Sequence, residues 1–124
     1  MNSIVLIALG SGLGGIARYV LSACLNSGRN FPVGTLLVNV LGSLAIGLLS
    51  GWLARHSGNG EAIRSFAVIG FCGGFTTFST FSNESFRLLE QGQWGLLVLY
   101  AGLSVSAGLG AVALGYLTFR GGVS

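Results

Sequence analysis

Polar side chains recur at helical spacing inside two strongly apolar stretches of this sequence. Thr35, Asn39 and Ser43 are each four residues apart, as are Tyr100 and Ser104 further along the chain. Residues four apart lie on the same face of an α-helix. A polar stripe on an apolar helix either lines a pathway for a polar solute or supplies hydrogen bonds between helices. The spacing alone leaves both interpretations open.

Two phenylalanines, Phe78 and Phe81, are three residues apart and are separated by Ser79 and Thr80. This spacing also places two side chains on one helix face. An aromatic ring has a negative face and a positive edge, so ring edges that project into a narrow, dry path can partner an anion. The alternative is core packing, which is the default role of aromatic side chains.

A glycine pair, Gly73–Gly74, precedes these phenylalanines within an apolar run, and the residues that follow are rich in hydroxyls. Glycine lowers helix propensity by roughly 1 kcal/mol relative to alanine. A broken helix at membrane depth persists only where protein or a water-filled cavity satisfies its backbone groups. The sequence therefore predicts a break at Gly73–Gly74 and makes residues 73–82 the leading candidate site.

Few residue combinations in this chain could support catalysis or classical metal binding. His56 is the single histidine, and the two cysteines, Cys24 and Cys72, lie in apolar stretches, so a zinc site and an enzyme active site are not expected. Arg18 and Glu84 are the charges closest to the predicted membrane interior. Each fits a polar vestibule, a structural salt bridge or the membrane surface.

Composition identifies the kind of protein that must hold these residues. Of the 124 residues, 52% are hydrophobic and 7% are charged, whereas soluble domains carry roughly 25% charged residues. The 22 glycines favour closely packed membrane helices. The formal charge of +3 comes from arginines that are scattered singly, so it lacks the dense basic stripe of a nucleic-acid-binding protein.

Four apolar segments are long enough to cross a bilayer, whose hydrocarbon core of about 30 Å needs about 20 helical residues. They comprise residues 4–25, 34–54, 65–89 and 94–119. The sequence therefore predicts a single transmembrane domain over residues 1–124. The predicted fold is an all-α integral membrane protein with four transmembrane helices, the third of them interrupted.

The arginines give almost no signal for orientation in the membrane. Four spans place both termini and the 55–64 loop on one side, with Arg55, Arg64 and Arg120, and leave Arg29 and Arg87 on the other. A difference of three against two barely orients a chain. We therefore expect insertion in both directions and pairing of each chain with an inverted copy of itself, as an antiparallel homodimer.

Three motifs resemble the Fluc or CrcB family of small bacterial fluoride channels. They are GGIARY at residues 14–19, GTLLVN at 34–39 and GFCGGFTTFSTFSNE at 70–84. The last run is long and specific, and the resemblance extends over essentially the whole chain. It implies a fluoride-selective channel in the bacterial inner membrane that passively exports fluoride from the cytoplasm.

The resemblance also implies specific partners and residues. It predicts a dual-topology homodimer with two fluoride pathways and a structural sodium ion at the dimer twofold axis, held by the backbone carbonyls of Gly73 and Thr76. Phe78 and Phe81 would offer ring edges to fluoride, Asn39 would donate from its amide, and Arg18 would lie near a vestibule. The full set of predicted pathway residues is Arg18, Thr35, Asn39, Phe78, Ser79, Thr80, Phe81, Tyr100 and Ser104.

The fourth span departs from this family pattern. The positions one and two turns beyond Ser104 are Gly108 and Val112, so the outer path would use other hydroxyls, such as Ser106 or Thr118, or water. Two other functions are compatible with four small spans. One is a proton-coupled small multidrug exporter, which needs a carboxylate at membrane depth. The other is a non-transporting membrane adaptor.

Overall fold

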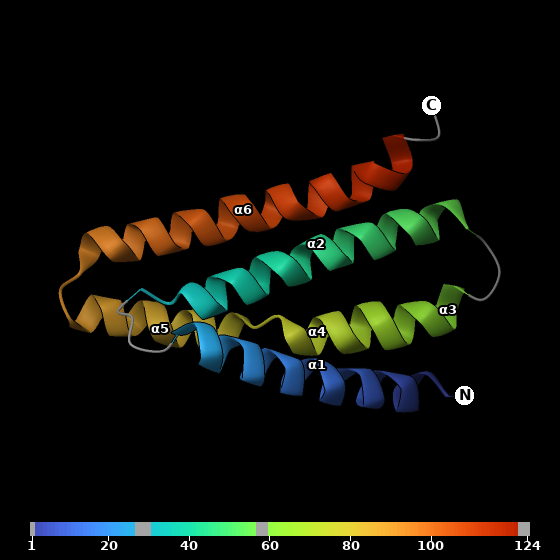
Figure 1. Ribbon diagram of the computed structural model, residues 1–124, viewed down its shortest axis with the longest axis horizontal. Helices are drawn as coiled ribbons and strands as arrows, with labels where there is room; N and C mark the ends of the chain where they lie inside the picture. The colour runs from blue at the N-terminus through green and yellow to red at the C-terminus, as the bar shows by residue number, and fades with distance from the viewer. Residues whose placement is uncertain (1, 27–30, 57–59, 122–124) are drawn as a thin grey trace.

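The computed structural model describes residues 2–26, 31–56 and 60–121, and it is helical nearly throughout (Figure 1). Three spans are single helices: α1 (Ser3–Asn26), α2 (Val33–Arg55) and α6 (Trp94–Gly121). The third span is composite and contains α3 (Gly60–Ile63), the π-helix η1 (Arg64–Cys72), α4 (Gly73–Phe75) and α5 (Phe78–Glu90). Four segments are long and apolar enough to cross a membrane, which confirms the predicted fold class.

Glycines allow the helices to pack in two close pairs. The contact of α2 with α6 is the most extensive of the structure, and that of α1 with η1 is the next. A Cβ added at Gly115 of α6 would lie 2.6 Å from the carbonyl oxygen of Leu44 on α2. A Cβ added at Gly10 or Gly14 of α1 would lie even closer to the backbone of the third span. Small residues at these positions let helix backbones approach within a membrane.

The turn between α5 and α6 also requires a glycine. Gly92 has a φ of +72°, a conformation in which a Cβ would be strained. Its N–H donates to the carbonyl of Leu89 at 3.0 Å, and the N–H of Gln93 donates to Leu88 at 2.9 Å. These two bonds form a Schellman motif that ends α5 and reverses the chain into the fourth span.

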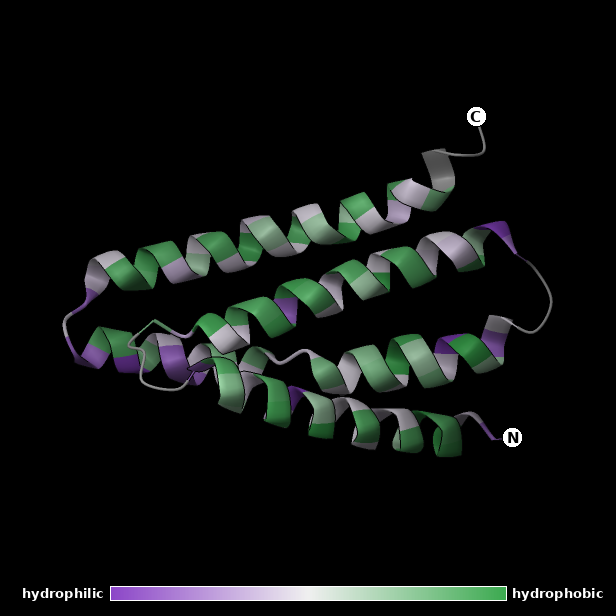
Figure 2. Ribbon diagram, in the orientation of Figure 1, coloured by the Kyte–Doolittle hydropathy of each residue, from purple (hydrophilic) through white to green (hydrophobic). Residues whose placement is uncertain are grey.

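Apolar residues predominate along the four spans (Figure 2), and many large apolar side chains are exposed in the described structure. Ile16, Val98 and Leu109 each expose about two thirds of their surface or more, at 64%, 70% and 69%. The interior holds few large side chains, chiefly Val38 and Tyr100, both fully buried. A lipid bilayer solvates such a surface without penalty, since lipid tails are as apolar as the side chains that meet them.

The predicted position of the break in the third span is wrong by a few residues. Gly73 and Gly74 are part of helix α4, and Gly73 has helical angles of −62° and −39°. The backbone becomes extended at Thr76 (φ −87°, ψ 156°) and Thr77 (φ −150°, ψ 121°). Gly74 instead provides close packing, because a Cβ there would lie 2.5 Å from the carbonyl oxygen of Ser11 on α1.

Candidate functional site at the broken helix

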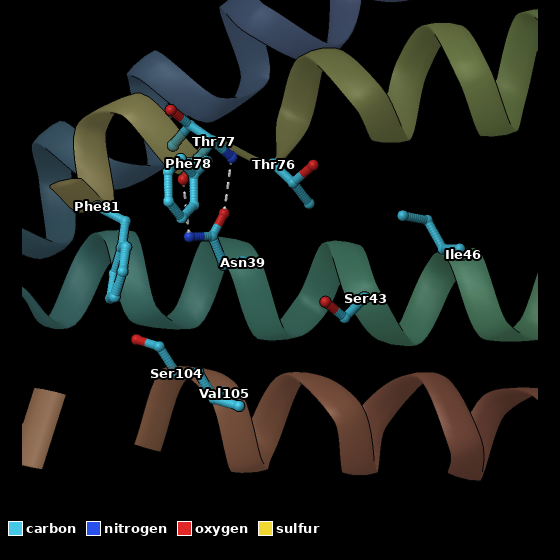
Figure 3. Close-up of a pocket in the computed structure, with 9 residues that line it drawn as sticks. All are labelled: Asn39, Ser43, Ile46, Thr76, Thr77, Phe78, Phe81, Ser104 and Val105. Carbon is cyan, nitrogen blue, oxygen red and sulfur yellow. Dashed lines mark hydrogen bonds between the residues drawn. The ribbon is translucent and has the colours of Figure 1, made fainter. Parts of the chain in front are cut away.

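The side chain of Asn39 on α2 holds the extended backbone of the third span. Its Nδ2 donates to the carbonyl of Thr77 at 3.1 Å, and its Oδ1 accepts from the N–H of Thr77 at 2.8 Å (Figure 3). The amide therefore pairs with both backbone groups of one residue, much as an opposite residue does in a neighbouring strand. An amide NH2 has two donor hydrogens, so one N–H of Asn39 remains for another acceptor. These bonds are the interhelical hydrogen bonding that the polar stripe of this helix allows, and the remaining N–H leaves open the donor role toward an anion that the resemblance implies.

The hydroxyl of Thr77 replaces a second helical hydrogen bond. Thr77 is the N-cap of α5, and its Oγ1 accepts from the N–H of Thr80 at 3.1 Å. Threonine is a favoured N-cap because its oxygen satisfies an otherwise unpaired backbone donor. The same hydroxyl donates to Oγ1 of Thr80 at 3.1 Å and lies 3.3 Å from the hydroxyl of Ser79. The hydroxyl-rich stretch is thus partly used to start α5.

Several backbone carbonyls lose their helical partners at the break, and those of Gly73 and Thr76 are among them. In a continuous helix Gly73 would accept from Thr77 and Thr76 would accept from Thr80, but both N–H groups are bound to side chains instead. Neither carbonyl accepts a hydrogen bond from any residue in the described ranges. Because no cluster of three His, Cys, Asp or Glu side chains occurs in these ranges, freed carbonyls are the cation ligands that this site offers.

Arg18 also binds the broken segment. Its Nε donates to the carbonyl of Gly74 at 3.1 Å, and the side chain is partly buried. A cation at the C-terminal end of a helix is favourable because it meets the negative end of the helix dipole and its unpaired carbonyls. The structure therefore gives Arg18 a capping contact at the end of α4, on the α1 side of the break.

Four aromatic rings form a continuous row beside the break. The ring centroids of Phe78 and Phe81 are 5.8 Å apart, those of Phe81 and Tyr100 are 5.0 Å apart, and those of Tyr100 and Phe31 are 5.6 Å apart. The two ends of the row differ in environment. Phe78 exposes 77% of its surface, whereas Tyr100 is fully buried.

A cavity of about 300 Å³ lies between α2, α6 and the broken segment (Figure 3). Four of the predicted pathway residues, Asn39, Phe78, Phe81 and Ser104, lie on its wall. The hydroxyl of Ser104 is buried and has no partner among the described residues. The complete lining is Asn39, Ser43, Ile46, Thr76, Thr77, Phe78, Phe81, Ser104 and Val105.

The other predicted pathway residues do not line this cavity. Thr35 and Tyr100 are fully buried, Ser79 is exposed, and Thr80 is part of the α5 cap. The hydroxyl of Tyr100 donates to Oε1 of Glu84 at 3.0 Å. Sequence reasoning missed this contact, because nothing in the local pattern links two residues that are sixteen positions apart.

Known proteins resemble this chain over nearly its full length. The family model for "CrcB-like protein, Camphor Resistance (CrcB)" matches residues 5–116. A fluoride-specific ion channel FluC from Methylobacterium sp. (strain 4-46) is 44% identical over 121 residues, 97% of each chain. The protein of that name from Novosphingobium aromaticivorans is 43% identical over 98% of each chain. The one from Coxiella burnetii (strain CbuK_Q154) is 46% identical over 95% of this chain and 98% of its own.

Proposed function

The chain belongs to the CrcB-like protein family, and from that premise we propose that it is a fluoride-selective channel through which fluoride leaves the bacterial cytoplasm passively. It is a multi-pass protein of the inner membrane and not an enzyme. The observation that carries the proposal is the cavity at the broken helix, whose wall combines neutral hydrogen-bond donors with two phenylalanine rings.

Neutral donors suit an anion that must be both bound and released. Fluoride is small and strongly hydrated, so a pore must replace its lost water with closely placed donors. Asn39, which keeps a second N–H, and Ser104, whose buried hydroxyl is unpaired, both belong to the cavity wall, and the edges of Phe78 and Phe81 add weak positive potential. Arg18 is not on the cavity wall, which avoids a full positive charge that would slow release.

The exposure of Phe78 supports a homodimer. In one chain the ring exposes 77% of its surface, although it lies on the cavity wall with Phe81. A second copy that covers this ring would enclose the cavity and narrow the path. We propose an inverted copy, because the nearly balanced arginines allow both orientations, and a twofold axis then generates two equivalent pathways.

A sodium ion on that axis would explain the unpaired carbonyls. The carbonyls of Gly73 and Thr76 lack helical partners, and two chains together supply four such oxygens. Backbone carbonyls of unwound helices are suitable ligands for small, hard cations. We assign the ion a structural role, because it would stabilise the broken conformation.

Flux measurements on purified protein in liposomes test the channel function. We expect rapid fluoride efflux when valinomycin and a potassium gradient set the voltage, with no chloride efflux. Proton-coupled movement of an organic cation would instead support the multidrug exporter. That mechanism needs a free carboxylate at membrane depth, but Glu84 accepts a hydrogen bond from Tyr100. Absence of both fluxes would support the adaptor.

Cysteine labelling tests the inverted dimer. Gln91 lies exposed in the turn between α5 and α6, so a Gln91→Cys variant in a background with Cys24→Ser and Cys72→Ser reports on one side of the membrane. We expect an impermeant thiol reagent to label about half of the molecules from each side. Labelling from one side alone would contradict dual insertion. The sodium assignment is tested separately by density for an ion between two Gly73–Thr76 segments in an experimental map of the dimer.

A further inference from the structure

Ser43 on α2 is a cavity residue that belongs to the polar stripe of α2 but not to the set of pathway residues that the family resemblance implies. It lies four residues beyond Asn39, which corresponds to about 6 Å along the helix axis. Figure 3 shows Ser43 on α2 between Asn39 and Ile46, on the part of the cavity wall where α2 lies next to α6. Its side chain is half-buried.

The hydroxyl of Ser43 is not used to satisfy its own helix. Other hydroxyls in the spans donate to the carbonyl four residues earlier: Ser22 to Arg18 at 2.6 Å, and Thr118 to Leu114 at 2.7 Å. Such bonds are the usual way in which serine and threonine satisfy their donors inside helices. Ser43 makes no hydrogen bond with any described residue, so its donor stays available on the cavity wall.

Ser43 faces a place where α6 has no side chain. An added Cβ at Gly108 would lie 3.7 Å from Oγ of Ser43, an ordinary van der Waals contact. The unpaired hydroxyl of Ser104 is one turn earlier on the same helix. The row of hydroxyls on α6 therefore ends at Ser104, and the next free hydroxyl on the cavity wall comes from α2.

The other hydroxyls considered for this part of the path are less well placed. Ser106 is exposed and does not line the cavity. The hydroxyl of Thr118 is already bound to the carbonyl of Leu114. Val112, one turn beyond Gly108, has no polar atom to offer. Ser43 is thus the hydroxyl that can follow Ser104 along this wall.

We propose that Ser43 donates a hydrogen bond to fluoride immediately after the anion leaves Asn39 and Ser104, so that the row of donors crosses from α6 to α2 at the level of Gly108. The interaction is a hydrogen bond to the anion, with no proton transferred. This inference rests on the proposed channel function, which it extends by one residue.

The experiment compares fluoride efflux from liposomes for matched variants. Ser43→Ala removes only the hydroxyl, and we expect fluoride efflux to slow by roughly tenfold, as for loss of one hydrogen bond to a charged group. Ser43→Ala with Gly108→Ser returns a hydroxyl to the same space from the facing helix, and we expect it to recover most of the wild-type rate. Ser106→Ala, the same substitution off the cavity wall, should leave the rate unchanged.

Each outcome is informative. Wild-type efflux from Ser43→Ala would overturn the inference, and so would a slow Ser43→Ala variant that Gly108→Ser fails to rescue. Size-exclusion elution identical to the wild type shows that the variants remain assembled, and the double variant distinguishes a lost donor from a loosened fold. If the wild-type protein conducts no fluoride, the proposed function itself fails, whereas conduction that is insensitive to Ser43 refutes this inference alone.

Discussion

Replacement of Asn39 by alanine should close the break in the third span. The substitution removes two hydrogen bonds, of 3.1 and 2.8 Å, that hold the peptide of Thr77. The N–H of Thr77 can then return to the carbonyl of Gly73, as in an ordinary α-helix. The loss of both hydrogen bonds therefore lowers the stability of the broken form relative to a continuous helix. In a continuous helix the proposed sodium ligands are no longer free.

The size of the effect follows from these two bonds. Hydrogen bonds between membrane helices contribute about 0.6 kcal/mol on average and at most about 1.7 kcal/mol. Two of them stabilise the broken form by about 1.2 to 3.4 kcal/mol. At 1.4 kcal/mol for each factor of ten, the ratio of broken to continuous helix falls by about 7-fold to about 270-fold. Efflux follows the population of the broken form, so we expect fluoride efflux from liposomes to fall in Asn39→Ala by at most the same factor.

The assay needs a control that loses a similar bond elsewhere. Asn26 accepts from the N–H of Gly34 at 2.7 Å, outside the broken segment, so Asn26→Ala also removes an asparagine–backbone contact. It should lower thermal stability but leave the efflux rate per folded dimer close to that of the wild type. Wild-type efflux from Asn39→Ala would refute the assignment of Asn39 as the group that holds the break open.

Sodium concentration provides a second readout for the same variant. An ion that binds the broken form alone shifts the equilibrium toward that form as its concentration rises. Efflux by Asn39→Ala should therefore recover partly in high sodium and not in equimolar N-methylglucamine. If sodium does not change the loss of fluoride efflux, the role of Asn39 still holds, but the assignment of the carbonyls as sodium ligands is contradicted.

Three further predictions test the surroundings of the break. Gly74→Ala should lower the yield of folded protein, because its Cβ would meet the backbone of α1 at 2.5 Å, whereas Gly73→Ala has no such neighbour and should express normally. Phe78→Ile and Phe81→Ile should both reduce fluoride efflux strongly, but only Phe81→Ile should lower the thermal stability of the isolated chain, since Phe78 is 77% exposed there and Phe81 packs on Tyr100. Tyr100→Phe removes the hydroxyl bound to Glu84 and should lower the free energy of unfolding by about 1 kcal/mol, as measured by chemical unfolding in detergent. The selectivity for fluoride over chloride should not change.

Some residues of the site could be predicted from the sequence more readily than others. Asn39, Phe78, Phe81 and Ser104 are polar or aromatic residues at helical spacing in apolar segments, and all four line the cavity. Periodicity is a local property, so it identifies a face of a helix before the fold is known. It does not identify the partner across that face. For this reason the sequence fitted two roles for Ser43 equally well, a hydrogen bond between helices and a place on the wall of a pathway.

The break was harder to place from the sequence. Glycine has the lower helix propensity, and propensity alone favours a break at Gly73–Gly74. The structure unwinds instead at Thr76 and Thr77, where the amide of Asn39 and the hydroxyl of Thr77 replace the lost helical bonds. A weak helix former remains helical when its backbone bonds have no better alternative, and Gly74 is used for close approach to α1.

Hydrophobicity and periodicity are local quantities, so the membrane environment, the four spans and the helix faces that carry polar and aromatic side chains follow from the amino-acid sequence. The position at which the third span unwinds, and the carbonyls that this frees, depend instead on how the helices pack. That choice is a competition between backbone bonds within one helix and side-chain bonds from another, and Asn39 is 38 residues from Thr77. The capping contact of Arg18 and the position of Ser43 opposite Gly108 depend on the packing of helices for the same reason.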